Sequence, residues 1–398
     1  MSTGEAGGPV VLMVLASPGP AVPVHLRSVV PRLEARGLLV HLAVAEHLAG
    51  HYGGLGSALV PLPVAARSST AGDVAATRHL RRAVRAVPGI DVVHAHGFRS
   101  GALATIALRG LRARPGFVTT WYDLALPTGS RILSVRAAER LIARSADVTL
   151  ATSTELQHRA RGLGARDVRL APIAPIAPER AGSGPVGSAA ADAVPRERGR
   201  TRLRARLAAE LGLQPERPWV LVVGRLVPER SGMLLSVADR WNVLHPPPEV
   251  LAVGEGQPAV VASLRQAVAA RQLPVHLLGD RADTVDLMQA CDVLVTTSRW
   301  ESRPLAVQQA MQLGLPVVAA RLAGIAELVS DTGVLVDVDD VDNLAGEVAA
   351  LLSDPDRALR LARRAARRAG TFPSEDEVAD SLVAAYRSAV AARARRRS

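Results

Sequence analysis

Short, almost wholly apolar runs alternate with amphipathic stretches through nearly the whole 398-residue chain. Val10–Leu15 in the front half and Trp219–Val223 in the back half are two such runs, and helical periodicity follows each. Strands that alternate with helices bury both of their faces, so the pattern predicts repeated βαβ units around a parallel sheet. With 48% hydrophobic residues the chain can bury sizeable cores, which excludes global disorder.

The alternation predicts an α/β fold with two doubly wound, Rossmann-like parallel-sheet domains that face a cleft. Predicted front strands are Val10–Leu15, Leu38–Val44, Asp91–Ala95, Gly116–Thr120 and Asp147–Ala151, with helices at Val24–Arg36, Thr77–Val87, Gly101–Arg112 and Ile132–Ser145. Predicted back strands are Trp219–Val223, Val250–Val253, Val275–Leu278, Val293–Thr296, Pro316–Ala319 and Gly333–Val336. We expect domains at 1–175 and 201–376, a Pro- and Gly-rich linker at 176–200, and a helix in 377–398 that packs back on the front domain.

The chain has 48 basic residues, and none of them is lysine. This excludes a Walker-A phosphate loop, a lysine Schiff base and a lysine general base. The single cysteine, Cys291, excludes a disulfide framework and a cysteine-based zinc or iron–sulfur site. The first apolar run, Val10 to Ala16, is too short to span a bilayer and follows no basic residue. We therefore expect a buried strand there and a cytoplasmic protein.

Positive charge is concentrated in the front of the chain. Residues 1–175 hold 20 arginines against 10 acidic residues, 176–218 hold 8 against 5, and 219–398 hold 20 against 22. An acidic membrane surface, an anionic substrate or nucleic acid would each suit this charge, and so would a simply solvated arginine surface. Aromatic stacking motifs and zinc-finger spacings are missing, so we expect no nucleic-acid partner.

The densest group of chemically useful residues is the segment 298–319, which directly follows a predicted strand. Glu301 lies on the turn after that strand, and Pro304 suits a first helical turn because its missing N–H costs nothing there. The N-terminus of the predicted helix Leu305–Leu313 can then bind an anion. Gln309 lies one and a half turns inside this helix, so both side chains can point into one cleft.

This segment resembles the Glu-x7-Glu motif of retaining glycosyltransferases of family 4, of the actinobacterial type, which have the two-domain GT-B fold. The matching residues are Ser298, Glu301, Pro304, Ala310, Met311, Gly314 and Pro316–Ala319. The resemblance implies that Glu301 holds hydroxyls of the donor sugar. It also implies that the nucleotide ribose lies at Gln309, where the family has a second glutamate; an exposed helix position without a ligand is the alternative. Further donor-binding candidates are Ser302, Arg303, Pro304 and Leu305.

Other segments occur in the order that the family has them. Residues 223–230 resemble a family segment, Val-Gly-Arg-Leu-x-x-x-Lys, whose arginine and lysine grip the donor diphosphate. The resemblance gives that role to Arg225 and Arg230, since arginine also binds phosphate. Residues 254–256 resemble a Gly-x-Gly turn, and 279–281 resemble the loop whose backbone reads the base. The donor-binding candidates from these segments are Gly224, Arg225, Arg230, Gly254, Gly279 and Arg281.

The front half resembles the family more loosely. The loop Pro18-Gly19-Pro20 replaces a glycine–glycine loop near the donor phosphate and the acceptor, and residues 91–97 fit the family well. Gly19 and His96 are therefore the candidate acceptor-side residues. Tyr122 occupies the position of a family histidine beside the reacting sugar; a core tyrosine with a satisfied hydroxyl is the alternative. His94 and His96 are expected to shape the strand end rather than to bind a metal.

Two functions remain open. The first is a retaining, hexosyltransferase-like enzyme that moves a sugar from a nucleotide-diphosphate sugar, without metal or cofactor because arginines neutralise the diphosphate. Its catalytic residues are then Glu301, Arg225, Arg230 and Tyr122. We further expect a lipid-linked acceptor and peripheral association of the basic front half with the anionic inner membrane face. The second is a non-catalytic relative that acts as a binding or partner protein, because the changes at 18–20, Tyr122 and Gln309 coincide.

Overall fold

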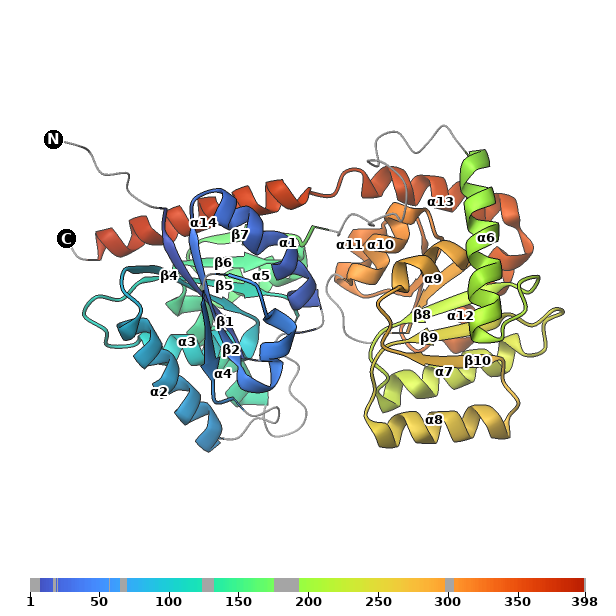
Figure 1. Ribbon diagram of the computed structural model, residues 1–398, viewed down its shortest axis with the longest axis horizontal. Helices are drawn as coiled ribbons and strands as arrows, with labels where there is room; N and C mark the ends of the chain where they lie inside the picture. The colour runs from blue at the N-terminus through green and yellow to red at the C-terminus, as the bar shows by residue number, and fades with distance from the viewer. Residues whose placement is uncertain are drawn as a thin grey trace. The chain divides into compact units, whose positions relative to one another are not determined.

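The computed structural model describes residues 8–16, 19, 21–56, 58–64, 70–123, 132–174, 193–297 and 304–396. The chain forms two compact units: unit 1 comprises residues 1–176 and 373–398, and unit 2 comprises residues 177–372 (Figure 1). Unit 1 is thus built from both ends of the chain, and unit 2 is the continuous segment between them. Each unit contains one sheet in which all strand pairs are parallel, which confirms the predicted α/β class.

Unit 1 has a seven-stranded sheet in the order β3-β2-β1-β4-β5-β6-β7. The strands are β1 Val10–Leu15, β2 Leu39–Ala45, β3 Ala58–Leu62, β4 Ile90–His96, β5 Gly116–Trp121, β6 Val148–Ala151 and β7 Val168–Leu170. Nearly every residue of β1, β4 and β5 is buried, because helices cover both faces of a central parallel strand. The strand order reverses between β1 and β4, and such sheets bind ligands at the carboxyl ends beside that reversal.

The helices of unit 1 come from distant parts of the chain. They are α1 Ala21–Ala35, η1 Glu46–Tyr52, α2 Thr70–Ala86, α3 Phe98–Leu108, α4 Ile132–Ser145, α5 Thr154–Gly162 and α14 Glu375–Arg395. In Figure 1 the red helix α14 lies among the blue and green elements of this unit, and it packs against α1, β4, β5 and β6. Its first turn is stabilised by a capping box, in which Ser374 and Glu377 each bind the backbone N–H of the other.

Close packing between α14 and β5 requires a glycine. A Cβ on Gly116 would lie 2.8 Å from the backbone of Ala389. Ion pairs hold both ends of the helix, since Asp380 binds Arg36, which directly follows α1, at 2.7 Å and Arg393 binds Asp91 of β4 at 3.0 Å. The last helix of the chain is therefore a fixed part of unit 1.

Unit 2 has a six-stranded sheet in the order β10-β9-β8-β11-β12-β13. Its strands are β8 Trp219–Val223, β9 Glu249–Val253, β10 Val275–Gly279, β11 Val293–Thr296, β12 Val317–Ala320 and β13 Val334–Val336. Its helices are α6 Ala193–Leu211, α7 Pro228–Trp241, α8 Pro258–Ala270, α9 Thr284–Ala290, α10 Leu305–Leu313, α11 Ala323–Val329, α12 Val341–Ser353 and α13 Pro355–Ala369. Aliphatic clusters fill both faces of the sheet, and the strand order reverses between β8 and β11.

Several elements differ from the prediction. Helix α6 begins at Ala193, inside the predicted linker 176–200, because a proline is tolerated in a first helical turn and tertiary contacts hold the helix. Arg204 donates to the carbonyl of Ala290 at 2.7 Å, and Arg200 pairs with Asp292. Four further elements, β3, β7, α5 and α11, were not predicted from the sequence. Within the described ranges, none of the helices combines the length and apolarity that a membrane span needs.

Candidate functional site

Three neighbouring strands of unit 2 end in glycines that the sequence predicts to bind the donor. Gly224 follows β8, Gly254 follows β9, and Gly279 is the last residue of β10. The N–H of Gly224 donates to the carbonyl of Val253 at 2.9 Å, and the N–H of Gly254 donates to the carbonyl of Gly279 at 2.8 Å. The sheet thus brings the three glycines together at its carboxyl edge, where parallel sheets bind ligands.

Gly224 and Gly254 leave no room for a side chain. Their φ angles are +144° and +143°, a region that only glycine adopts readily. A Cβ on Gly254 would overlap the carbonyl of Gly224, and a Cβ on Gly224 would overlap the guanidinium of Arg230. The strand ends are therefore packed backbone to backbone, and Arg230 lies directly over the end of β8.

The two arginines predicted to grip a diphosphate stand at this glycine edge. Arg225 is exposed, and no residue in the described ranges forms an ion pair or hydrogen bond with its guanidinium. Arg230 lies in the first turn of α7 and is half-buried against Gly224. Each guanidinium offers five N–H donors in a fork that matches phosphate oxygens. The edge thus carries two positive charges beside backbone that a ligand can approach closely.

The side chain of Arg281 is already engaged within the protein. Its Nε and Nη2 donate to the two carboxylate oxygens of Asp283, each at 2.7 Å, and Nη2 also donates to Glu210 of α6 at 2.7 Å. The hydrogen bonds that Arg281 donates to Asp283, and then the one to Glu210, raise the pKa of Arg281 above its usual value. Two carboxylates thus hold Nε and Nη2 of this guanidinium within the protein.

Helix α10 has the predicted bounds, Leu305 to Leu313, but Pro304 is its N-cap residue rather than part of its first turn. Among the described residues, Pro304 provides no side-chain cap for this end of the helix. The first-turn N–H groups of such a helix can bind an anion. Gln309 is partly exposed, whereas its neighbour Gln308 is fully buried. The predicted site residues Glu301, Ser302 and Arg303 lie outside the described residues.

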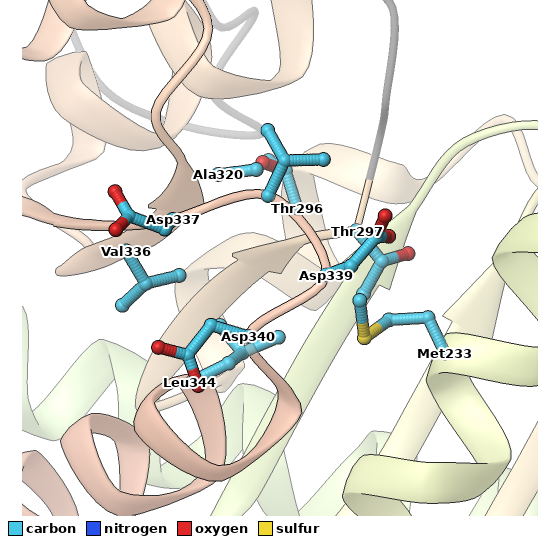
Figure 2. Close-up of a pocket in the computed structure, with 10 residues that line it drawn as sticks. Met233, Thr296, Thr297, Ala320, Val336, Asp337, Asp339, Asp340 and Leu344 are labelled. Carbon is cyan, nitrogen blue, oxygen red and sulfur yellow. The ribbon is translucent and has the colours of Figure 1, made fainter.

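A small cavity opens at the carboxyl ends of β11, β12 and β13 (Figure 2). Its volume is about 10 Å³, which suits roughly one water molecule and is far too small for a nucleotide sugar. The hydroxyls of Thr296 and Thr297 are buried at this cavity, and no hydrogen-bond partner for them lies in the described part of the chain. Asp340, on the rim, caps α12 by accepting the N–H of Asn343 at 3.1 Å. The cavity can therefore hold about one water molecule, and its lining residues do not include Gly224, Gly254 or Gly279.

In unit 1 the candidate residues His96 and Tyr122 meet at the carboxyl ends of β4 and β5. His96 ends β4, and Tyr122 directly follows β5. Nδ1 of His96 forms a 2.7 Å hydrogen bond with the hydroxyl of Tyr122, and the two rings stack at an interplanar angle of 22°. Tyr122 is buried, with an exposed fraction of 9%. Its hydroxyl thus has a hydrogen-bond partner, as in a core tyrosine, yet Tyr122 lies at the carboxyl edge, where parallel sheets of this kind bind ligands.

Gly19 lies close to this pair. Its carbonyl accepts the N–H of Val22 at 3.0 Å, which joins the loop to the start of α1. A Cβ on Gly19 would lie 4.0 Å from Oδ2 of Asp123, the residue after Tyr122. The two acceptor-side candidates, Gly19 and His96, are therefore near the same strand ends, while Pro18 and Pro20 lie outside the described residues.

Behind His96 and Tyr122 lies a buried aromatic cluster that sequence reasoning did not assemble. The ring of His94 lies 4.0 Å from that of His96, and the ring of His25, on α1, lies 6.4 Å from that of Tyr122. Tyr386 of α14 completes the cluster. A signal for His25 was its polar side chain on the apolar face of the predicted first helix. No local signal could connect Tyr386 with a strand some 290 residues earlier.

Burial keeps these imidazoles neutral. Desolvation lowers the pKa of His25 to about 4 and that of His94 to about 3, and it lowers the pKa of His96 well below its usual value. Desolvation also raises the pKa of Tyr122, so its phenol stays protonated. The His96–Tyr122 pair therefore offers a ligand hydrogen bonds rather than charge. Across the described ranges, no group of three His, Cys, Asp or Glu side chains is arranged to hold a metal ion.

Comparisons with known proteins cover both units. Residues 21–175 match the family described as glycosyl transferase 4-like domain, and residues 217–354 match glycosyl transferases group 1. The D-inositol 3-phosphate glycosyltransferase of Segniliparus rotundus is 31% identical over 196 residues, 47% of this chain and 43% of that relative. That of Xylanimonas cellulosilytica is 30% identical over 318 residues, which cover 74% of this chain and 71% of the relative. The chain belongs to the family 4 glycosyltransferases.

Solved structures agree on the fold of this family 4 glycosyltransferase. Sucrose-phosphate synthase from Thermosynechococcus elongatus is similar with a TM-score of 0.73 at 20% identity, over 97% of this chain and all of that chain. Anabaena HepE in complex with UDP-glucose is similar with a TM-score of 0.70 at 21% identity, over 94% of this chain and 98% of that one. This family 4 glycosyltransferase thus has the predicted GT-B fold.

Proposed function

We propose that this glycosyltransferase binds a uridine-diphosphate sugar at the glycine edge of unit 2 and transfers the sugar with retention of configuration. The observation that carries the proposal is the contact between Gly224, Gly254 and Arg230, beside the exposed Arg225. Two guanidinium groups match the charge of a diphosphate, so the donor needs no metal for neutralisation. Anabaena HepE, a protein of the same fold, is known with UDP-glucose bound, which supports uridine as the base.

The bond from the sugar to the diphosphate breaks as negative charge grows on the leaving phosphate. Donors that are already aimed at that position lower the barrier, because they need no reorganisation during the reaction. Arg225, Arg230 and the N-terminus of α10 supply such donors in unit 2. In retaining chemistry of this family the acceptor hydroxyl attacks from the face that the leaving group occupies, so no protein nucleophile is needed.

Tyr122 takes the place of the family histidine beside the reacting sugar. If Nδ1 of His96 carries the proton, its N–H donates a hydrogen bond to the hydroxyl oxygen of Tyr122. Nε2 then has only a lone pair, which stays buried without a partner in the described part of the chain. The opposite tautomer would leave an N–H without a partner, which is the costlier outcome. The hydroxyl proton of Tyr122 then points away from His96 and donates to an oxygen of the substrate.

The acceptor proposed for unit 1 is an anionic molecule that carries free hydroxyls. Residues 1–175 hold twice as many arginines as acidic residues, 20 against 10. The Xylanimonas relative is named for D-inositol 3-phosphate, a phosphorylated polyol of this class. A phosphate on the acceptor would be drawn to the basic unit, while its hydroxyl reaches the sugar.

A donor and acceptor panel tests this function. Uridine, guanosine and adenosine diphosphates are compared by thermal shift, and a true ligand at 100 times its dissociation constant adds about 2.7 kcal/mol of stability. Transfer is then measured from the matching nucleotide sugars to D-inositol 3-phosphate and to unphosphorylated inositol. We expect selective stabilisation by uridine diphosphate and transfer only to phosphorylated acceptors. If the protein binds a nucleotide but transfers sugar to no acceptor in the panel, the result would favour the alternative function, a non-catalytic binding or partner protein.

Replacing Gln309 by glutamate is expected to tighten nucleotide binding about fivefold, roughly 1 kcal/mol. A carboxylate accepts hydrogen bonds from both ribose hydroxyls at once, whereas an amide has one acceptor oxygen. Gln266→Glu makes the same charge change at an exposed position of α8 in the same unit and serves as the control. Titration calorimetry with uridine diphosphate measures both variants. Unchanged affinity in Gln309→Glu would mean that Gln309 does not face the ribose.

The basic face of α2 is expected to bind anionic membranes, which would bring the enzyme to a lipid-linked acceptor. Arg78, Arg82 and Arg85 are exposed on α2 and have no partner in the described ranges. Arg81, on the same helix, instead donates to the carbonyl of Arg109 at 2.8 Å. Each free arginine contributes about 1 kcal/mol near an acidic surface, and salt screens this attraction.

Flotation with vesicles of anionic phospholipid tests the membrane prediction. The triple substitution of Arg78, Arg82 and Arg85 by glutamine should abolish binding at low salt. The same triple change at Arg360, Arg363 and Arg367, exposed on α13 of unit 2, is the control and should leave binding intact. Equal binding by wild type and both triple variants, or no binding by the wild type at low salt, would contradict the prediction.

A further inference from the structure

We propose that Tyr386, on the C-terminal helix α14, is a positioning residue that orients the Tyr122–His96 pair through His94. The proposal rests on the function proposed above, because it concerns the same end of the unit 1 sheet. Tyr386 lies a few turns from the end of the chain and belongs to no segment that resembles the family motifs. Its position in the fold, rather than its place in the sequence, brings it to the site.

The first link is a hydrogen-bonded imidazole. Nδ1 of His94 lies 2.8 Å from the hydroxyl of Tyr386, and Nε2 lies 2.7 Å from Oγ1 of Thr120. His94 and Tyr386 are completely buried, and Thr120 is 5% exposed. A neutral imidazole donates from one nitrogen and accepts at the other, so the two hydroxyls satisfy it fully. With both nitrogens bound, the ring of His94 is fixed in its plane.

The second link passes from His94 to the candidate site. His94 and His96 lie two residues apart on β4 and therefore face the same side of the sheet. Their ring centroids are 4.0 Å apart with an interplanar angle of 37°, so a rotation of one ring displaces the other. His96 in turn holds the hydroxyl of Tyr122 at 2.7 Å. Thr120 lies two residues before Tyr122 and pairs with His96 across the strands.

The third element is the rigidity of the helix that carries Tyr386. One turn further along, Ala389 contacts Gly116 of β5 so closely that a Cβ on Gly116 would lie 2.8 Å from its backbone. Arg393 pairs with Asp91 at 3.0 Å and fixes the following turn to β4. Because α14 cannot shift toward or away from the sheet, the hydroxyl of Tyr386 has a fixed position relative to His94.

The hydroxyl of Tyr386 has no other described partner than His94. A phenylalanine would fill the same space and keep the edge-to-face contact with His94, whose centroid lies 5.5 Å from that of Tyr386. Tyr386→Phe therefore removes the hydrogen bond between the Tyr386 hydroxyl and His94 without removing the aromatic ring. This makes the orienting role separable from packing.

Kinetics form the first test, with the full-length protein. Tyr386→Phe is expected to lower kcat for sugar transfer about fivefold, the effect of one lost hydrogen bond. The KM for the donor and the dissociation constant of uridine diphosphate should not change, because the donor site lies in unit 2. In a Tyr122→Phe background the second change should have no further effect on kcat, since the oriented hydroxyl is already gone. An equal loss in both backgrounds would overturn the proposal.

Tyr52→Phe is the matched control. Tyr52 is also completely buried in unit 1, and its hydroxyl has no hydrogen-bond partner among the residues that the structure describes. Loss of that hydroxyl should leave kcat unchanged. A general effect of removing a buried phenol from this unit would instead lower kcat in both variants alike, and that result would also overturn the proposal.

A readout independent of activity separates this inference from the proposed function. The ring nitrogens of His94 and His96 are followed by NMR in protein labelled with 15N-histidine, with signals assigned from His94→Gln and His96→Gln. Tyr386→Phe should shift the signals of both rings, whereas Tyr52→Phe should shift neither. If only the His94 signals shift, Tyr386 does not affect the orientation of His96, and the proposal is rejected. If the Tyr386→Phe change shifts the signals of both rings but the wild-type protein transfers no sugar, the positioning role is supported and the proposed transferase function is rejected.

Discussion

Replacing Arg230 by methionine is expected to lower kcat for sugar transfer by a factor of about 100 to 1,000, roughly 3–4 kcal/mol of transition-state stabilisation. The guanidinium of Arg230 lies over Gly224 at the end of β8, where a diphosphate leaving group would gain charge. Methionine keeps most of the aliphatic stem and removes only the charged group. Because Arg230 is half-buried on the first turn of α7, the free energy of unfolding should change by no more than about 1 kcal/mol.

Arg240→Met provides a control on the same helix. Arg240 lies in the last turn of α7, is exposed and pairs with Asp342 on the surface of unit 2. Surface ion pairs of this kind contribute about 0–1 kcal/mol, and the position is remote from the glycine edge. Steady-state kinetics and urea unfolding are measured for both variants. Equal kcat values for Arg230→Met and Arg240→Met would reject the diphosphate role of Arg230.

Acidification from pH 7 to pH 5 is expected to lower the free energy of unfolding of unit 1 by about 4 kcal/mol or more. His25, His94 and His96 are neutral when folded, with pKa values of about 4, about 3 and well below the usual 6.5. Between these values and 6.5 the unfolded chain binds more protons, so stability rises with pH and is lost as pH falls. Protonation of His25 and of His94 in the unfolded chain each lowers the free energy of unfolding by roughly 2 kcal/mol at pH 5, and His96 acts in the same direction.

The tyrosines give a local probe for this experiment. The chain has three of them, Tyr52, Tyr122 and Tyr386, and all lie in unit 1. Fluorotyrosine signals in urea titrations at several pH values therefore follow this unit alone. His25→Leu should reduce the slope of the free energy of unfolding against pH by about one third, because one of three titrating histidines is removed. His158→Gln, at an exposed position of the same unit, should leave this slope unchanged. The explanation fails if His25→Leu retains the wild-type slope.

The central strands were predictable because their burial is visible in local composition. A strand with helices on both faces is apolar throughout, as β8 and β11 are, and its ends are marked by glycine or turn residues. The edge strands β3 and β7 were missed because they are short and mostly half-buried or exposed, and β3 contains Pro61. Local sequence patterns thus identify buried strands, but they do not distinguish short, half-exposed edge strands from loops.

The same distinction applies to the site. Gly224, Gly254 and Gly279 could be predicted because each directly follows or ends an apolar strand, so the parallel sheet must gather them at one edge. The engagement of Arg281 could not, because one of its carboxylates comes from Glu210, 71 residues away. The contact between His94 and Tyr386 spans 292 residues and depends on how α14 crosses the sheet. Side-chain partners at such separations are set by tertiary packing, which no local pattern encodes.

The return of the chain to unit 1 has a consequence for biosynthesis. Residues 1–176 are synthesised well before residues 373–398, so the face of β4 and β5 against which α14 packs stays uncovered until α14 has left the ribosome. Unit 2, encoded without interruption, can complete its core while the nascent chain is still attached. Unit 2 can therefore complete its fold before unit 1 does. During that interval the apolar surface of β5 is exposed to chaperones and to other nascent chains, and the docking of α14 covers it.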